Sequence, residues 1–153
     1  MKKFLAIVGG LFLALLLITA IFFGYAAYNG SKLDASSKIY IEENIPTILS
    51  TWSKDTILKL ASPQLIETIE NNQTNIDLLL TKSATLGKFQ KISDIKGDSN
   101  TSFTTQNGSV ITSRYAVQAK FDNGEATITV TLIQLSGQWR LLGLFINSPS
   151  ILQ

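Results

Sequence analysis

The chain contains no histidine and no cysteine among its 153 residues. Without histidine it lacks the commonest general base and the commonest metal ligand. Without cysteine it has no thiol nucleophile, no zinc-thiolate site, no disulfide and no lipid-modified N-terminal cysteine. We therefore expect a protein that is stabilised by a hydrophobic core, with no metal and no cofactor.

An excess of charge of either sign is also missing beyond the N-terminus. Two of the thirteen basic residues are Lys2 and Lys3, which leaves eleven basic residues against eleven acidic ones. The nearest approach to a basic cluster is interpreted as a solvated strand face and consists of Lys88, Lys91 and Lys96. Nucleic-acid binding requires a basic patch or stripe, so we expect no nucleic acid as a partner.

A long uncharged run follows the two N-terminal lysines and extends from Phe4 to Gly30. A helix of about 20 apolar residues is long enough to cross a bilayer. The run therefore predicts a membrane anchor within residues 1–30, which contacts the membrane through residues 4–28.

The position of the lysines predicts the orientation of this anchor. Lys2 and Lys3 favour a cytoplasmic N-terminus, which places residues 31–153 in the periplasm or outside the cell, behind a single pass through the inner (cytoplasmic) membrane. The alternative is a secretory signal peptide that is cleaved near Ala26 and releases a secreted protein.

The first half of the exported part, about residues 35–86, has helical periodicity. Ile41, Ile45, Ile48 and Trp52 follow one another at spacings of four, three and four, which predicts one buried helix face. Pro46 lies inside this helix and is expected to kink it or to start a new one. Further helix starts are predicted at two capping residues, Ser53 and Ser62, the second followed by Pro63.

From about residue 87 to residue 147 the apolar period becomes two. Residues 110–121 and 125–135 alternate well and are joined by a turn at 122–124, whereas 88–97 is a less regular strand. Residues 99–109 are polar and are expected to form a turn-rich connection. The chain is thus predicted to be an α+β protein, with helices packed on a curved antiparallel sheet of about four strands.

The C-terminal half carries a resemblance. The segment "DNGEATITVTLIQLSGQWRLLGLFINS", with Gly137, Trp139 and Gly143, resembles the nuclear transport factor 2-like superfamily, and more narrowly its small exported bacterial domains. The resemblance covers about residues 37–148. It implies a cone-shaped α+β fold with a cavity at its open end. Some members are enzymes, such as ketosteroid isomerase, and many others are binding, dimerising or assembly modules.

No catalytic constellation stands out. The remaining candidates are a tyrosine, Tyr40 or Tyr115, paired with a carboxylate, Asp94 or Glu125. A catalytic carboxylate needs burial to raise its pKa, and by periodicity none of the eleven lies on an apolar face. We therefore predict no catalytic residues and a protein that is not an enzyme.

The last strand is apolar on both sides, and this predicts a contact surface. Trp139, Leu141 and Phe145 are expected to face the helices. The other side of the last two strands is expected to present five apolar residues, namely Ile133, Leu135, Leu142, Leu144 and Ile146. Such a patch usually marks an interface. The first functional hypothesis is a membrane-tethered interaction or assembly module that docks a second copy or another envelope protein.

The second hypothesis is a protein that binds a small apolar molecule inside the cone. Its predicted lining consists of Tyr115, Val117, Phe121, Trp139 and Phe145, and aromatic side chains often line such sites. The same residues must also fill the core, and Trp52 and Trp139 are interpreted as core residues. The two hypotheses differ in the face of the sheet that they use.

Overall fold

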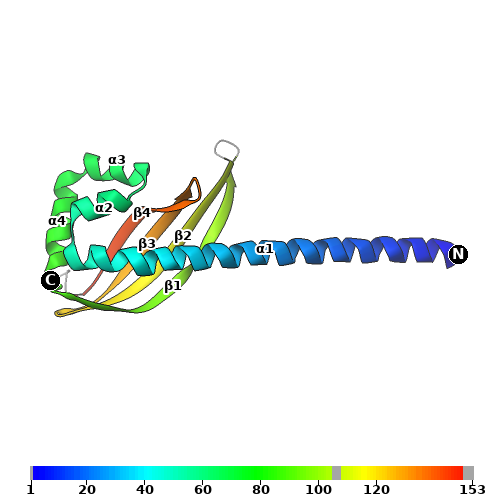
Figure 1. Cartoon of the computed structure of the whole chain (residues 1–153), viewed down its shortest axis with the longest axis horizontal. Coiled ribbons are helices and arrows are strands. Elements are labelled where there is room, and N and C mark those ends of the chain that lie inside the picture. Colours follow the sequence, from blue (N-terminus) through cyan, green and yellow to red (C-terminus); the bar gives the residue numbers. More distant parts are fainter. Residues whose placement is uncertain (1, 105–107, 150–153) are drawn as a thin grey trace. The chain divides into compact units, whose positions relative to one another are not determined.

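The computed structural model of the chain describes residues 2–104 and 108–149. The chain divides into two compact units, Met1–Leu33 and Asp34–Gln153. Helix α1 (Lys2–Thr51) begins in the first unit and ends in the second (Figure 1). The two units are described separately.

The first unit consists of the N-terminal part of α1. Several of its apolar side chains, such as Leu17 and Ile21, are exposed. Among the side chains that the structure describes, no helix offers a stretch long and apolar enough to span a bilayer. Most of the predicted anchor, residues 4–28, lies outside those described side chains, so the anchor remains a prediction.

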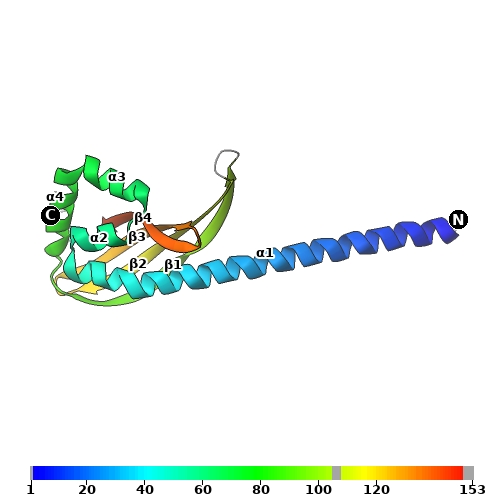
Figure 2. The ribbon, with the colours of Figure 1, turned by 45° about the horizontal axis from the view of Figure 1, so that its top comes forward.

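The second unit has the predicted α+β composition. Its helices beyond α1 are α2 (Lys54–Leu60), α3 (Pro63–Asn71) and α4 (Gln73–Ala84). Its strands are β1 (Phe89–Thr104), β2 (Gly108–Phe121), β3 (Gly124–Leu135) and β4 (Gln138–Asn147). They form one antiparallel sheet in the order β1-β2-β3-β4. Helices α2, α3 and α4 gather at one end of this sheet (Figures 1 and 2).

The predicted helix starts are confirmed. The Ser53 side chain accepts a hydrogen bond from the Thr56 amide, and the Ser62 side chain accepts one from the Leu65 amide, 3.3 Å away. Pro63 occupies the first helical position, where a backbone N–H has no acceptor within the helix. The absence of an N–H group in proline therefore removes no hydrogen bond. Helix α1, in contrast, continues through Pro46 to Thr51 without a new start.

The core lies between α1 and one face of the sheet, here called the inner face. The predicted stripe is confirmed, because Ile41, Ile45 and Ile48 of α1 are fully buried and Trp52 is nearly so. Opposite them lie the alternate residues of the sheet, which are buried as the period of two requires: Tyr115, Val117, Ala119, Phe121, Ala126, Ile128, Val130 and Leu132. The other side of the sheet is here called the outer face.

Strand β1 is longer than expected, and the expectation of a turn-rich connection over residues 99–109 is wrong for most of that range. The ladder between β1 and β2 continues from Ser99, opposite Ser113, to Thr104, opposite Gly108. Serine and threonine side chains are compatible with a strand when the opposite strand supplies continuous backbone partners. A prediction based on composition alone therefore took the second half of β1 for a connection.

Two irregularities in β1 explain why its apolar residues do not alternate. The register shifts between Phe89 and Lys91, and again between Ile92 and Asp94, so that Gln90 and Ser93 are extra residues. Each bulge moves the following side chains to the opposite face. Phe89 and Ile92 thereby both lie opposite buried residues of β2, on the inner face.

Candidate interaction surface

A bulge in β4 decides which residues form the outer face. Thr131 pairs with Gly143, and the next residue of β3, Leu132, pairs with Leu141, so that Leu142 is skipped. The side chains on either side of Leu142 therefore follow opposite alternations. Before the bulge, Leu141 lies opposite the fully buried Leu132, as expected for an inner-face residue.

Beyond the bulge, the predicted orientation of three residues is wrong. Leu144 pairs with Val130 and Ile146 pairs with Ile128, both of which belong to the inner face. Ile146 is only 8% exposed, and Leu144 lines an apolar cavity of about 50 Å³ with residues of α2, α3 and α4. Phe145, which was expected to face the helices, is 66% exposed. Because Leu142 is an extra residue, Leu144, Phe145 and Ile146 each lie on the face opposite to the predicted one.

Of the other predicted interface residues, Leu142 is the skipped residue of the bulge, whereas the two on β3 lie where alternation placed them. Ile133 and Leu135 alternate with the buried Leu132 on β3 and so belong to the outer face. Ile133 is only 7% exposed, whereas Leu135 and Leu142 are half-buried. The accessible apolar surface on this side is therefore centred on Phe145.

The outer face has two halves of different character. On β1, β2 and the start of β3 it carries charged side chains that form ion pairs, Lys96 Nζ to Asp94 Oδ2 at 2.7 Å and Lys120 Nζ to Glu125 Oε1 at 3.5 Å. The hydrogen bond from Lys96 lowers the pKa of Asp94, and the same bond raises the pKa of Lys96. Between Glu125 at the start of β3 and Arg140 near the start of β4, the outer face carries three half-buried threonines, Thr127, Thr129 and Thr131, beside Gly143 and Phe145.

The predicted lining of a ligand pocket forms part of the core instead. Tyr115, Val117, Phe121 and Trp139 are all buried, and only the fifth residue of that set, Phe145, is exposed. Trp52 stacks on Phe121 with ring centroids 5.9 Å apart, which confirms that Trp52 packs in the core. The cavity that Leu144 lines includes none of these residues.

The polar groups of this core tie the start of the second unit to the sheet. The Tyr115 hydroxyl lies 2.9 Å from Ser37 Oγ and donates to the Asp34 carbonyl oxygen at 3.2 Å. The Trp139 indole N–H donates to Ser36 Oγ at 2.9 Å. Ser37 Oγ also lies 3.0 Å from Ser99 Oγ. We call these residues of α1, with Ser99, Tyr115 and Trp139, the polar clamp; sequence periodicity gave no signal for it.

The tyrosine and carboxylate candidates for catalysis are not brought together. Asp94 and Glu125 are on the outer face, whereas Tyr115 is on the inner face. Tyr40 of α1 donates a hydrogen bond to the Leu60 carbonyl oxygen at 3.3 Å. Burial raises the pKa of Tyr40, an effect that the nearby Arg140 guanidinium partly opposes.

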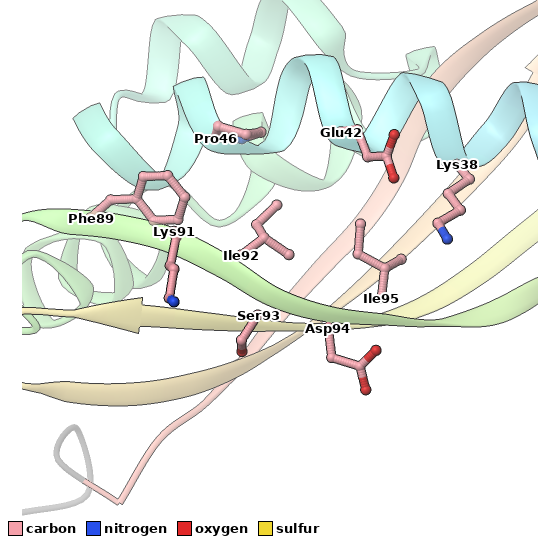
Figure 3. Close-up of a pocket in the computed structure, with 9 residues that line it drawn as sticks. All are labelled: Lys38, Glu42, Pro46, Phe89, Lys91, Ile92, Ser93, Asp94 and Ile95. Carbon is pink, nitrogen blue, oxygen red and sulfur yellow. The ribbon is translucent and has the colours of Figure 1, made fainter.

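A groove of about 530 Å³ runs between α1 and β1 (Figure 3). Its apolar side chains, Ile92 and Ile95, point toward α1, and its rim carries Lys38 and Glu42. The groove follows the free edge of the sheet, where an extended peptide could in principle pair with β1.

The edge of β1 is protected against such pairing. The Asp34 carboxylate accepts the backbone N–H of Ser99 at 2.6 Å, so this donor is already occupied. At the other end the Asp122 carboxylate accepts the N–H of Lys88 at 3.3 Å, and the bulges at Gln90 and Ser93 interrupt the ladder. Bulges and capped donors are the usual protection of an edge strand. These features disfavour strand addition along this groove.

Within the described residues no group of three acidic, histidine or cysteine side chains is placed to hold a metal ion. Comparison of the chain with protein-family models, with curated proteins and with solved structures gives no match to any of them. The resemblance to the nuclear transport factor 2-like superfamily therefore stays a prediction.

Proposed function

We propose that this protein is a membrane-tethered, non-enzymatic interaction module that acts outside the cytoplasm through the outer face of its sheet. The observation that carries the proposal is Phe145, a phenylalanine that is 66% exposed near the C-terminal end of β4, between the half-buried Leu144 and the buried Ile146. An exposed apolar group on a regular element is typical of a contact surface.

The energetics support a role for this residue in binding. Burying a phenylalanine side chain stabilises a folded or bound state by about 1.5–3 kcal/mol relative to leaving it in water. In the unit Asp34–Gln153 Phe145 obtains little of this stabilisation, since two thirds of its surface remains in water. A partner that covers Phe145 would supply this stabilisation to the complex.

The tether is supported by the sequence that precedes the unit. Lys2 and Lys3 are followed by an uncharged run from Phe4 to Gly30, and α1 continues from this run into the domain without interruption.

The second hypothesis, a small apolar ligand inside the cone, has less support. Four of its five proposed lining residues are packed in the core. The cavity between the helices and Leu144 has a volume of about 50 Å³, far below the roughly 300–1,000 Å³ of typical ligand sites.

The proposal is tested by photo-crosslinking in the native membrane. A photoreactive phenylalanine analogue is placed at Phe145 of the full-length chain, and, as the matched control, at Lys96 on the charged half of the same face. We expect a discrete protein adduct from position 145 and little or none from position 96. Equal adducts at both positions, or none at 145, would contradict the proposal.

A further inference from the structure

One end of the sheet is a ribbon of only two strands. Residues 100–104 of β1 pair with residues 108–112 of β2 without a register shift. Strand β3 joins β2 from Thr112 onward, so among the described strands residues 108–111 pair with β1 alone. We call residues 100–104 and 108–111 the projecting ribbon, which extends beyond β3 and β4 (Figure 1).

The projecting ribbon lacks the support that a two-stranded unit needs. An isolated pair of strands is at most marginally stable in water, whereas a third strand or a covered apolar face stabilises it. Val110 and Ile111 are only half-buried, and the side chains of residues 100–102 are exposed. The strand order ends at β1, so no described strand covers its free edge. This edge is where a third strand would support the ribbon.

The backbone groups along this edge alternate in direction. Ser99 donates its N–H to the Asp34 carboxylate and not to β2, which makes Ser99 and Ser113 a non-hydrogen-bonded pair. The distance of 2.8 Å between their hydroxyl oxygens agrees with this pairing, in which opposite side chains lie close together. Such pairs alternate along an antiparallel ladder, so the N–H and C=O groups of Thr101 and Phe103 also point away from β2.

The protection of the edge of β1 ends at Ser99. Within the described part of the chain, the Thr101 N–H has no acceptor. The ladder from Asn100 to Thr104 has no bulge, and the sequence between Asp98 and Arg114 contains neither a proline nor a charged residue. Bulges, prolines and charges are the features that usually prevent an edge strand from pairing. This stretch therefore remains open to another strand.

We propose that the open edge binds an extended segment of another protein, which adds a third strand to the projecting ribbon beside β1. The inference goes beyond the proposed function, because it uses the edge of the sheet and not its outer face. An extended polypeptide presents donors and acceptors at the same two-residue repeat, about 6.8 Å, as Thr101 and Phe103. Main-chain hydrogen bonds of this kind supply the affinity in strand addition.

The length and chemistry of the edge define the segment that fits it. Asp34 of α1 occupies the edge at Ser99, so only residues 100–104 are open, and a single short segment can use them. The exposed side chains of Asn100, Thr101 and Ser102 are polar and uncharged. Cross-strand contacts of threonine and serine favour hydroxyl-bearing partners, whereas a charged residue would meet no opposite charge there. We therefore expect an uncharged segment that contains serine or threonine.

The inference is tested by photo-crosslinking of the full-length chain in its native membrane. A photoreactive residue replaces Asn100 beside the open edge or, as the control, Gln64, an exposed residue of α3. We expect a discrete adduct with another protein from position 100, and at least tenfold less from position 64.

The decisive variant adds Thr101→Pro to the photoreactive residue at position 100. Proline removes an N–H that points away from β2, so the ladder to β2 is kept, and proline is tolerated on edge strands for this reason. We expect at least a tenfold loss of the adduct. Thr101→Val retains the N–H, is the matched control and should keep the adduct. Should Thr101→Pro disturb the ribbon, seen as faster exchange of the Ser102 amide, Phe103→Pro repeats the test.

The outcomes separate this inference from the proposed function. An adduct that persists in both proline variants overturns the inference, since the contact then does not depend on the edge. An adduct of twice the chain's mass overturns the assignment to another protein. No adduct from position 100, together with a protein adduct from position 145, overturns the inference and leaves the proposed function standing. The reverse result overturns the proposed function alone.

Discussion

The orientation of each residue around the β4 bulge can be read from the effect of truncating its side chain. Ile146 is nearly buried on the inner face, so Ile146→Ala should destabilise the unit Asp34–Gln153 by about 2–4 kcal/mol. Phe145 is largely exposed, so Phe145→Ala should change the free energy of unfolding by less than about 0.5 kcal/mol in the dilute protein. Urea unfolding measures both values. Equal losses would mean that the bulge is misplaced.

Two glycines of the sheet should respond in opposite ways to the same substitution. A Cβ on Gly97 would collide with the Arg114 carbonyl oxygen and lie 2.7 Å from Tyr115 Cα, so Gly97→Ala should destabilise by at least about 1–3 kcal/mol. Gly143→Ala meets open space and should be neutral or stabilise by up to about 1 kcal/mol. Thermal unfolding of the dilute protein compares the two. A loss of stability in Gly143→Ala would contradict the open space at this position.

The exposed ion pair of Asp94 and Lys96 predicts how stability depends on pH. Since Lys96 lowers the folded-state pKa of Asp94, the pair contributes above the unfolded pKa of Asp94, and its contribution is lost as the pH falls through the folded pKa. Both side chains are exposed, so we expect little effect on stability. Lys96→Ala should raise the Asp94 pKa toward its ordinary value in an NMR titration, whereas Lys120→Ala should not. An unchanged Asp94 pKa in Lys96→Ala would contradict the assigned pair.

At the scale of elements, the polar clamp joins the start of the second unit to the sheet. Tyr115→Phe removes the hydroxyl that contacts Ser37 and Asp34, and should cost about 0.5–1.5 kcal/mol. The loss should be local, because α1 is still held by its apolar residues beyond Ile41.

Hydrogen exchange measures this local effect. In Tyr115→Phe the amides of residues 34–37 should exchange faster, while those of β2 and β3 keep their protection. Tyr40→Phe, which removes a longer hydrogen bond of 3.3 Å, is the control and should leave residues 34–37 unchanged. Loss of protection throughout the sheet would show that the hydroxyl supports the whole core and not the helix start.

At the scale of the whole molecule, the predicted topology can be tested by cysteine labelling, since the chain has no cysteine of its own. Gln138→Cys, at the exposed start of β4, should react with a membrane-impermeant maleimide in cells whose outer barrier is permeabilised. A cysteine inserted after Met1 should react only after the inner membrane is opened, because the proposed orientation, with Lys2 and Lys3 inside, keeps it cytoplasmic.

The same samples distinguish an anchor from a cleaved signal. A retained anchor leaves the full-length mass in the membrane fraction, whereas cleavage near Ala26 releases a shorter, soluble chain. Labelling of the N-terminal cysteine in intact cells would contradict the proposed orientation.

Local sequence determined which kind of element forms and where most elements begin. The Ser62–Pro63 pair marks a helix start because both residues act through backbone atoms within one turn. The alternation in β2 and β3 identified their buried residues, since successive side chains of a regular strand must point to opposite faces. These features depend on neighbours in the chain, so they could be predicted.

Only the tertiary structure determined which face of the sheet each side chain of β1 and of the far half of β4 occupies. It thereby also determined which residues form the candidate surface. Either set of alternate residues could face the core in an apolar run such as Leu141, Leu142, Gly143, Leu144. The pairing with β3 determines which residue of the run is skipped. Here β3 pairs regularly while α2, α3 and α4 cover Leu144, so the extra residue falls at Leu142. Because the side-chain period is two, that one residue moves Phe145 from the core to the surface.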